Sequence, residues 1–405
     1  MTLDVLICGG GIAGNALALQ LARSGFRPTV VERSVTARPG GQAVDLRGPS
    51  REVADRMGLT PGIERRRLNE KGMIFLDDRG RERVRMPAEL FGGNGGVAEI
   101  EITRGDLNQV LLDEISKVGG VDYRYGEWVT AVAQDSRGVL VRFASGTAQR
   151  FDLVVGADGV HSAMRRMVFG PEENFTEYLG GYMSFFTMPT PRSLRSEPGW
   201  FRMYSMPGAV TAGIRADVDA ATSKAIVTVR MPSDPGLRRD AAAQRRLVRA
   251  RLAAGGWEVP AILAALDDAE DLYFDELARV TMPKWSHGRV ALLGDAAFCG
   301  SPLTGQGTAM ALLGAYVLAG ELAGNPSDIA RAFERYEAVL RPFVDLAREL
   351  PPGGLRAMTP SSRIGIRVGQ AMTKLMTTRL LEPLMTRMLA KTDDYDLPEY
   401  SLTHQ

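Results

Sequence analysis

The chain has 405 residues, a length typical of two or three domains and sufficient for a large buried core. Lys and Arg together number 49 and Asp and Glu 48, and a net charge of +1 argues against a protein built mainly to bind nucleic acid or an acidic membrane. Hydrophobic residues make up 45% and charged residues 24%, a balance that excludes extended disorder.

Cysteines and histidines are too few for a disulfide framework or a zinc site built from these residues. Cys8 and Cys299 cannot form a disulfide scaffold or a four-ligand zinc site, and we expect both to be buried. His161, His287 and His404 do not stand at metal-ligand spacing, so no metal site is predicted. No membrane span or secretory signal is predicted either, because polar residues and glycines interrupt the apolar run near the N-terminus. A cytoplasmic location is therefore the expectation.

The N-terminus carries the pattern of a dinucleotide-binding βαβ unit. Residues 3–8 and 27–32 have the apolar character of buried strands, and residues 15–24 that of a helix. Between the first strand and the helix, Gly9, Gly11 and Gly14 form G-x-G-x-x-G. The pattern is specific because strand, glycine turn, helix and second strand follow one another in the required order.

Each residue of this pattern has a physical reason. Gly9 allows a tight turn, Gly11 allows the backbone to approach a pyrophosphate, and Gly14 allows the helix to pack on the strand. The start of the helix offers free N–H groups and a positive dipole end to the phosphates. Glu32 ends the second strand, where a carboxylate accepts hydrogen bonds from ribose and disfavours a 2′-phosphate. FAD or NAD is therefore favoured over NADP as the tightly held nucleotide.

Two further strands end in acidic residues. Residues 151–157 lead into Asp158-Gly159, and residues 290–293 lead into Gly294-Asp295. The second is followed by a loop containing Pro302 and then by Gly305-Gln306-Gly307, which opens a helix. With Arg104 in Thr103-Arg104-Gly105-Asp106-Leu107, these stations stand in one order along residues 1–345.

In this set of motifs the sequence resembles the class A flavoprotein monooxygenases, which have the para-hydroxybenzoate hydroxylase fold. The segment Gly40-Gly41-Gln42-Ala43-Val44-Asp45-Leu46 is similar to that of the tetracycline-inactivating branch. The resemblance and the glycine turn together assign FAD contacts to Gly9, Gly11, Ala13, Gly14, Glu32, Arg33, Asp45, Arg104, Asp158, Gly159, Asp295, Pro302, Gly305 and Gly307. It implies that Asp295 binds the ribityl chain and that the helix after Gly307 directs its positive end at the flavin.

The resemblance implies an α/β fold with three parts. A Rossmann-like FAD-binding domain of the glutathione-reductase type is expected at 1–72, 98–170 and 271–345. An inserted antiparallel substrate sheet is expected at 73–97 and 171–270, and a helical segment at 346–405. Within the sheet, residues 181–188, 199–206, 209–216 and 224–231 read as strands, and 73–76 with 83–86 as a hairpin. Phe185, Met203 and Leu303 are the predicted substrate contacts.

Further helices are predicted in the second half of the chain. Residues 240–252, 260–266 and 327–350 fit helices, the last with a kink at Pro342, and residues 355–391 fit one or two more. Basic residues punctuate this last stretch. A helix that covers the substrate domain or forms a dimer contact is favoured over one lying on a membrane surface.

The resemblance implies the reaction. NADPH or NADH would reduce FAD and leave, O₂ would add to give a flavin C4a-hydroperoxide, and an aromatic or polycyclic small molecule would take up one oxygen atom. No acid, base or nucleophile is nominated as catalytic. Hydroxylation and Baeyer–Villiger insertion, and monomer and homodimer, are compatible with the sequence. A halogenase, a flavin-dependent reductase and a non-catalytic flavin or ligand carrier are the alternatives.

Three positions depart from the family pattern. Phe298 stands where many members have His, and Ala309 and Gly314 replace residues that are often polar or larger. The phosphate and ribityl contacts do not depend on these positions, so FAD binding is still expected. The sequence alone supplies no physical reason for Gly314.

Overall fold

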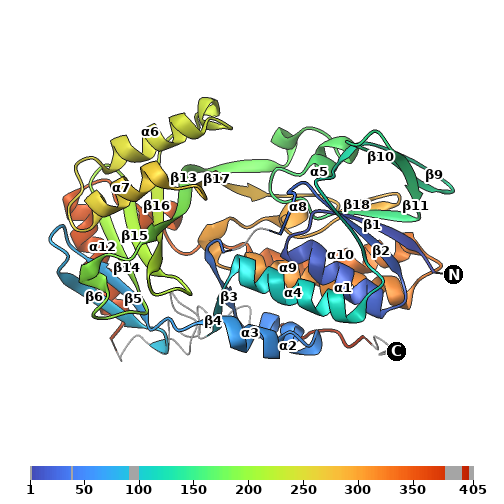
Figure 1. Ribbon diagram of the computed structural model, residues 1–405, viewed down its shortest axis with the longest axis horizontal. Coiled ribbons are helices and arrows are strands. Elements are labelled where there is room, and N and C mark those ends of the chain that lie inside the picture. Colours follow the sequence, from blue (N-terminus) through green and yellow to red (C-terminus); the bar gives the residue numbers. More distant parts are fainter. Residues whose placement is uncertain (1, 38–39, 91–99, 379–394, 401–405) are drawn as a thin grey trace.

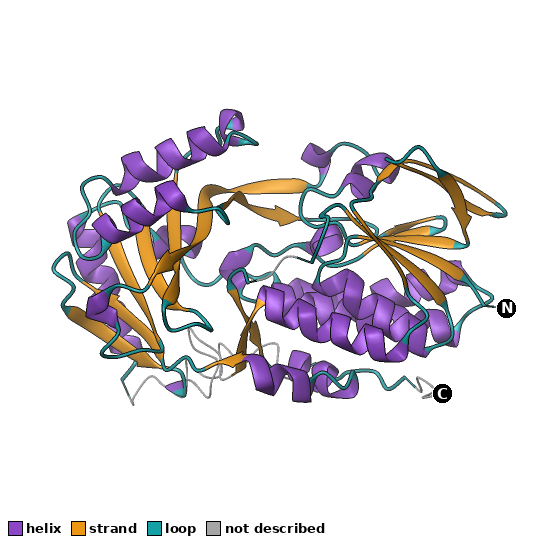
Figure 2. Ribbon diagram, in the orientation of Figure 1, coloured by secondary structure: helices purple, strands orange, loops and turns teal. Residues whose placement is uncertain are grey.

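The computed structural model describes residues 2–37, 40–90, 100–378 and 395–400. Two lobes lie side by side in Figure 1, the N-terminal lobe on the right and the sheet of the middle residues on the left. The predicted fold class is confirmed: a parallel α/β domain carries an inserted, mainly antiparallel sheet. Helices and strands alternate in the first lobe and segregate into layers in the second (Figure 2).

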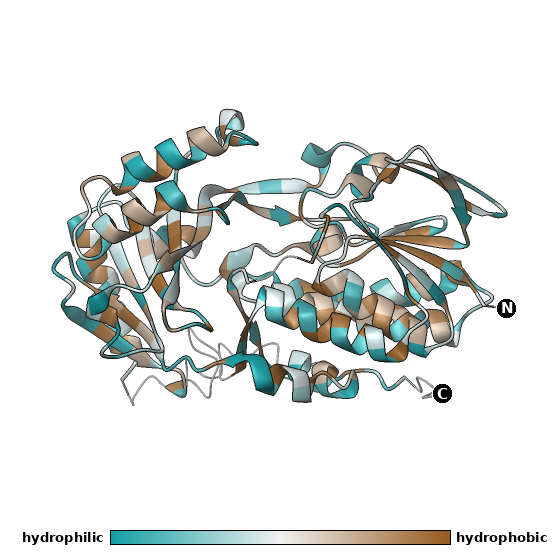
Figure 3. Cartoon of the chain, viewed as in Figure 1, coloured by the Kyte–Doolittle hydropathy of each residue, from teal (hydrophilic) through white to brown (hydrophobic). Residues whose placement is uncertain are grey.

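A six-stranded sheet forms the centre of the N-terminal lobe. Its order is β18-β19-β12-β1-β2-β8, and every neighbouring pair is parallel except β18 with β19. The strands are β1 (Asp4–Cys8), β2 (Arg27–Glu32), β8 (Asp122–Tyr125), β12 (Leu153–Gly156), β18 (Ser286–His287) and β19 (Val290–Leu292). β1 and β12 are almost wholly buried, as strands covered on both faces should be, and they are brown in Figure 3.

Helices pack below this sheet and a small antiparallel sheet lies above it (Figure 1). The helices are α1 (Ile12–Arg23), α4 (Arg104–Val118), α9 (Gly307–Gly324) and α10 (Ile329–Ala347), and the small sheet contains β9 (Val129–Asp135), β10 (Gly138–Phe143) and β11 (Ala148–Phe151). α9 contacts α1, α10 and α2 (Pro49–Arg56). Among the described residues α9 is the one helix long and apolar enough to cross a membrane, and 83% of it is buried inside the protein.

The second lobe is a seven-stranded sheet of order β17-β13-β16-β15-β14-β5-β6. All its pairs are antiparallel except β14 with β5. The strands are β5 (Gly72–Leu76), β6 (Glu82–Pro87), β13 (Thr176–Pro189), β14 (Trp200–Met206), β15 (Val210–Ala216), β16 (Thr222–Arg230) and β17 (Tyr273–Val280). The four predicted middle strands and the predicted hairpin are all present.

One face of this sheet is covered by two helices. These are α6 (Ala241–Leu252) and α7 (Val259–Asp268), whose apolar residues form a separate core with Phe186, Tyr204 and Val227. Side chains alternate between the faces of a strand, so Met183, Phe185 and Ile226 lie on the other face. That second face is turned toward the N-terminal lobe, since Met183 and Phe185 cluster with Leu303.

One predicted boundary is wrong. Residues from 271 onward were assigned to the FAD-binding part, yet β17 belongs to the substrate sheet because it pairs along β13 from Thr176 to Phe185. The two strands run between the lobes. A second, three-stranded antiparallel sheet, β3 (Ala43–Leu46), β7 (Ile100–Thr103) and β4 (Arg67–Leu68), links the lobes elsewhere.

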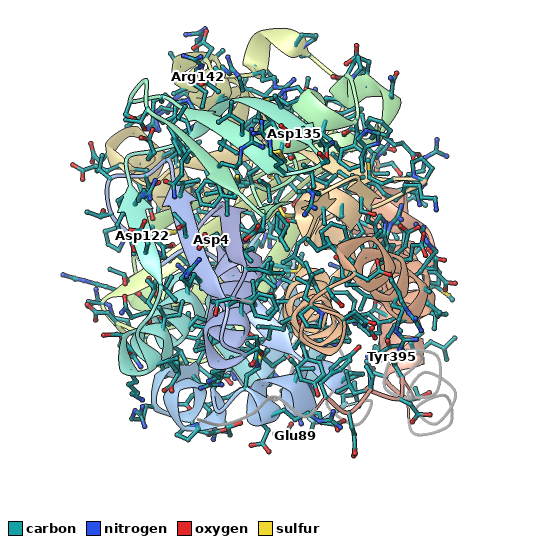
Figure 4. All side chains as sticks on the ribbon, turned by 90° about the vertical axis from the view of Figure 1, so that its right-hand side faces the viewer. Asp4, Glu89, Asp122, Asp135, Arg142 and Tyr395 are labelled. Carbon is teal, nitrogen blue, oxygen red and sulfur yellow. The ribbon has the colours of Figure 1, made fainter. Side chains whose placement is uncertain are left out.

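The C-terminal part packs first on the substrate sheet and then on the N-terminal lobe. The expected helical stretch appears as α11 (Gly354–Met358) and α12 (Arg363–Met376), and α12 packs against β6 and β14 of the substrate sheet. Residues 379–391 of the prediction lie outside the described residues. The tail at 395–400 returns to the N-terminal lobe, where Tyr395 donates a hydrogen bond to the carbonyl of Val339 on α10 (2.9 Å; Figure 4).

Candidate functional site

The glycine turn lies between the carboxyl ends of β1 and β12. Gly9 has a φ of +113°, and a Cβ there would stand 2.5 Å from the carbonyl oxygen of Ala157. A Cβ on Gly14 would stand 1.9 Å from the carbonyl oxygen of Gly9. Both positions therefore require glycine for steric reasons, and α1 starts directly beneath the turn.

Open space lies over Gly11, a predicted pyrophosphate contact, and over Gly307, which opens the helix predicted to face the flavin. A Cβ on Gly11 would meet nothing nearer than Arg104 Nη2 at 3.9 Å, and a Cβ on Gly307 would meet nothing within 4 Å. Both residues stand at the start of a helix, α1 and α9, where backbone N–H groups lack partners within the helix. We call the glycine turn and these two helix starts the cradle. It fits a ligand with negative charge, as FAD carries on its pyrophosphate.

Neighbouring predicted contacts shape this cradle. Ala13 packs closely on the strand end at Gly294: a Cβ on Gly294 would stand 2.9 Å from the Ala13 Cβ, so position 294 favours glycine. Glu32 accepts hydrogen bonds from the backbone N–H of Gly10 (2.9 Å) and of Ser34 (2.8 Å), and its oxygens retain lone pairs for a ribose. The Arg33 guanidinium lies over the Trp128 ring, 5.8 Å from its centroid.

Asp295 and Arg104 form the charged part of the site. Asp295 is the first residue of α8 (Asp295–Phe298) and its side chain is exposed, although protein atoms surround it. That enclosure raises the pKa of the Asp295 carboxyl, while the nearby Arg104 guanidinium lowers it. An accessible carboxylate inside a concave wall is suited to hydrogen bonding the hydroxyls of a ribityl chain.

Asp45 lies below the loop that precedes α9. A Cβ on Gly305, whose φ is +67°, would stand 3.6 Å from Asp45 Oδ2, and Arg47 donates to the same oxygen at 2.7 Å. Burial, helped by Glu101, raises the pKa of Asp45 to about 6, although Arg47 opposes the shift. Pro302 opens the short 3₁₀ turn of this loop, next to Leu303.

A buried cluster of charges joins Asp45 to the substrate sheet. Arg215 of β15 pairs with Glu70 (2.6 Å) and with Glu101 of β7. Burial raises the pKa of Glu101 to about 7 against the opposing effect of Arg215. This charge cluster, Asp45, Glu70, Glu101 and Arg215, fixes the position of the sheet relative to the loop before α9.

Asp158 has a different immediate task from the one predicted. Its carboxylate accepts hydrogen bonds from the backbone N–H of Ala163 (2.7 Å) and Met164 (3.0 Å), at the start of α5 (Ala163–Val168), and from the Ser162 hydroxyl. Buried Arg165 then donates to the carbonyl of Ala296 at 2.9 Å. The motif thus holds α5 against α8. Gly159, with a φ of +83° and no atom within 4 Å of a Cβ, remains open to a ligand.

The three predicted substrate contacts come together. Leu303 packs in one cluster with Phe185 and Met183 of β13, and Met203 of β14 lies in the adjoining cluster, which shares Ile226. All of these face the loop before α9, not the core under α6 and α7. The result is an apolar wall, defined here as Met183, Phe185, Met203, Ile226 and Leu303.

Two departures from the family pattern compensate each other. Phe298 is fully buried against Trp285, with ring centroids 4.7 Å apart. A Cβ on Gly314 would stand 3.2 Å from the Phe298 ring and 2.8 Å from Leu293. Gly314 therefore makes room for the larger side chain, which supplies the physical reason that the sequence lacked. Ala309 is buried near the start of α9.

A second hollow lies at the edge of β17. It has a volume of about 350 Å³, and its basic lining residues are Arg33, His161, Arg166, Arg238 and Arg239. Asp275 and Glu276 line it as well. The sequence indicated Arg33 alone, because the other residues come from segments far apart along the chain.

The two cysteines are buried, as expected. Cys8 and Cys299 are free and buried, and burial raises the pKa of both thiols well above the usual value. Over the described ranges, no cluster of His, Cys, Asp and Glu is suited to a metal ion.

Comparison with known proteins agrees with this geometry. A family profile described as FAD binding domain matches residues 2–343. A flavin-dependent monooxygenase from an unknown prokaryotic organism is 36% identical over 347 residues, covering 85% of this chain and 87% of that protein. Another, from Legionella longbeachae, is 34% identical over 359 residues, covering 85% and 86%. The crystal structure of tetracycline destructase Tet(51) has 32% identity and a TM-score of 0.80, covering 99% of this chain and 100% of that one.

Proposed function

Since the chain belongs to the FAD-binding domain family and is a flavin-dependent monooxygenase, we propose that it hydroxylates an aromatic or polycyclic small molecule, using O₂ and NADPH or NADH. The observation that supports this substrate class most directly is the apolar wall opposite the loop before α9. Met and Phe side chains offer a broad, polarisable surface on which a flat ring system can pack. Tetracycline destructase Tet(51) is named for a polycyclic compound, which favours the polycyclic alternative.

Bound FAD supplies the chemistry that activates O₂ and transfers one oxygen atom to the substrate. The residues of this chain hold and shield the reactants. The starts of α1 and α9 offer N–H groups to negative charge, and Asp295 and Arg104 bind polar groups of the cofactor. The apolar wall excludes water and orients the ring to be hydroxylated.

The basic hollow at the edge of β17 is the proposed docking place for the phosphates of the nicotinamide nucleotide. Arg33, Arg166 and Arg238 line this hollow, and guanidinium groups bind phosphates in bidentate fashion. The described residues contain a single glycine turn of the dinucleotide type, which suits a nucleotide that binds briefly and leaves.

The test measures oxygen transfer directly. Purified flavin-loaded protein is mixed with NADPH or NADH and a panel of aromatic and polycyclic compounds under isotopically labelled O₂. We expect at least one compound to stimulate nicotinamide oxidation and to gain one labelled oxygen atom, detected by mass spectrometry. The Gly11→Ala protein, whose cradle is filled by a methyl group, serves as the matched control and should be inactive.

Other outcomes identify the alternatives. Stimulated nicotinamide oxidation that continues without O₂ would indicate a reductase. A product that forms only with chloride or bromide would indicate a halogenase. Ligand binding without any stimulation across the panel would favour a flavin or ligand carrier over the proposed enzyme.

A further inference from the structure

The C-terminal helix α12 packs on the substrate sheet with its less apolar side. It contacts β6 and β14, and the residues that become half-buried are mostly small or polar. They are Gly365, Ile366, Gly369, Gln370, Thr373 and Met376. None of the fourteen residues of α12 is fully buried, and none belongs to a hydrophobic core. The helix therefore lies on the sheet without being part of its interior.

The larger apolar side chains of α12 point away from the sheet. Ile364, Val368, Met372 and Leu375 are 75%, 57%, 47% and 50% exposed. Because they recur at intervals of four, four and three residues, they lie along one side of the helix, and we call them the outer stripe. A surface helix usually directs such a stripe into the core of its own protein. An exposed stripe of this kind is typical of a helix that contacts an apolar partner outside the chain.

A row of cations follows one edge of the outer stripe. Arg363, Arg367 and Lys374 each stand one position before a residue of the stripe, so they share one side of the helix next to it. All three are exposed, and α12 contains no Asp or Glu. Lys and Arg side chains in such places lay their methylene groups along apolar surface and keep their charge at its border. This combination is typical of a helix in the interface of an acidic membrane.

The position of α12 in the molecule suits contact with a surface. Gln370 Nε2 donates to the carbonyl of Leu76 at 3.4 Å, which ties the helix to the end of β5. The turn that follows β5 adds exposed Arg79, and β6 is an edge strand of the sheet. In Figure 1, α12 and β6 lie at the end of the substrate lobe that is farthest from the N-terminal lobe. A flat surface can therefore reach this end of the molecule.

We propose that α12 docks on the surface of a membrane containing acidic phospholipids, with the outer stripe among the acyl chains and Arg363, Arg367 and Lys374 at the phosphates. A helix of fourteen residues with three charges is too short and too polar to span the membrane, so it lies on it. A second copy of α12 would bring further cations and no carboxylate, whereas acidic lipids supply the complementary charge. The inference goes beyond the proposed function and does not depend on it.

The test measures flotation of the full-length, flavin-loaded protein with lipid vesicles. Vesicles of equal parts phosphatidylglycerol and phosphatidylcholine are compared with vesicles of phosphatidylcholine alone, at about 0.1 M and about 1 M salt. We expect binding to the mixed vesicles in the lower salt, and binding weaker by about tenfold or more without acidic lipid or in the higher salt. Arg367→Gln should weaken binding to the mixed vesicles about fivefold, the effect of one cation near an acidic surface.

Val368→Glu tests the outer stripe, and Val218→Glu is the matched control. Val218 lies in the turn between β15 and β16 and is 63% exposed. Val368→Glu should weaken binding to the mixed vesicles by about tenfold or more, because a carboxylate replaces an apolar group and is repelled by the lipid phosphates. Val218→Glu should bind as tightly as the wild-type protein. The flavin absorbance of each variant verifies that the fold is intact.

The inference is overturned if the wild-type protein does not bind the mixed vesicles, or if the two glutamate substitutions have equal effects. A wild-type dimer that Val368→Glu dissociates, detected by sedimentation velocity, would instead assign the outer stripe to a second copy of this chain. A lower melting temperature in Val368→Glu, with no change in Val218→Glu, would place the stripe inside the fold and likewise overturn the inference.

Discussion

The cofactor cradle and the apolar wall are built from different parts of the polypeptide. The cradle is formed mainly by backbone: the glycine turn after β1 and the starts of α1 and α9 offer N–H groups, and methyl groups are excluded from Gly9 and Gly14. The wall is formed by side chains from strands far apart along the chain. A backbone site tolerates almost no change at a few positions, whereas a side-chain site can be altered residue by residue without loss of the fold.

The largest expected effect is that of Gly14→Ala. The added Cβ would collide with the carbonyl oxygen of Gly9 at 1.9 Å, and this backbone atom cannot move aside as a flexible side chain would. We expect a loss of about 3 kcal/mol or more in the free energy of unfolding, together with loss of FAD. Urea denaturation and the flavin absorbance of the purified protein measure both.

Gly11→Ala tests FAD binding separately from the stability of the fold. Its Cβ meets only Arg104 Nη2 at 3.9 Å, so stability should change by no more than about 0.5 kcal/mol. FAD affinity should nevertheless fall, because the methyl group occupies the space over the helix start. Full FAD occupancy in this variant would show that the pyrophosphate lies elsewhere.

Arg215→Met tests the side-chain link between the lobes. The substitution removes the cation that pairs with the buried carboxylates of Glu70 and Glu101, which should cost about 3–5 kcal/mol. In the wild-type protein the pKa of Glu101 is raised from 4.5 to about 7, so the folded state binds more protons than the unfolded state across this interval. Glu101 therefore lowers stability as pH rises from 4.5 to about 7, and the defect of Arg215→Met should shrink in acid. Unfolding curves at several pH values would contradict this if the defect were constant.

Asp295→Ala removes the one side chain to which the cradle assigns the ribityl chain. A hydrogen bond to a charged acceptor contributes about 1.5–3 kcal/mol, so FAD affinity should fall about ten- to hundredfold. The fold should persist, since the carboxylate is exposed. Fluorescence titration with FAD measures the change, and Asp295→Asn is the isosteric control; undiminished affinity in the alanine variant would remove Asp295 from the site.

His161→Gln should have a smaller, pH-dependent effect. The hydrogen bonds to Asp275 and Glu172 raise the folded-state pKa of His161 from 6.5 to about 9, so its contribution is fully present below pH 6.5 and is lost as pH rises through about 9. After allowance for solvent screening we expect a loss of about 1 kcal/mol in the variant at neutral pH. Above that range the wild-type and variant unfolding curves should converge; a constant difference would mean that charge is not the cause.

Met203→Leu should change least. The two side chains have similar volumes, so the free energy of unfolding should shift by less than about 1.5 kcal/mol and FAD affinity should stay the same. Relative rates across the substrate panel should change, because the branched side chain alters the apolar wall. Identical substrate preferences in the two proteins would place Met203 outside the substrate site.

The contrast between the two regions also explains what the sequence could predict. The glycine turn could be predicted because its strand, turn and helix are contiguous in the sequence. The structure shows the steric reason for Gly9 and Gly14. The strands of the substrate sheet followed from their alternation, although β17 was assigned to the wrong lobe because its partner β13 lies nearly 100 residues away.

The surroundings of Tyr273 could not be predicted from the sequence. They depend on which face of β17 it occupies and on its hydrogen bond to Asp275, which in turn contacts His161 from a distant segment. Gly314 is similar, since its reason is the ring of Phe298. The hydrogen bonds that Asp158 accepts from the start of α5 could not be read from the motif either, because they depend on how α5 packs after the strand.

The alternation of side chains along β17 constrains how this enzyme can diverge. Tyr273 lies beside Phe185 of the apolar wall, and Phe274 stacks on Tyr182 on the opposite face. Inserting or deleting one residue before Tyr273 would exchange the faces, turning Phe274 toward the apolar wall and Tyr273 and Asp275 toward the helices. Individual side chains of this strand can therefore be substituted as the substrate range changes. A change in the length of the strand must involve an even number of residues or be accommodated in the loop after α7. Related enzymes should accordingly differ by substitutions in this strand far more often than by insertions or deletions.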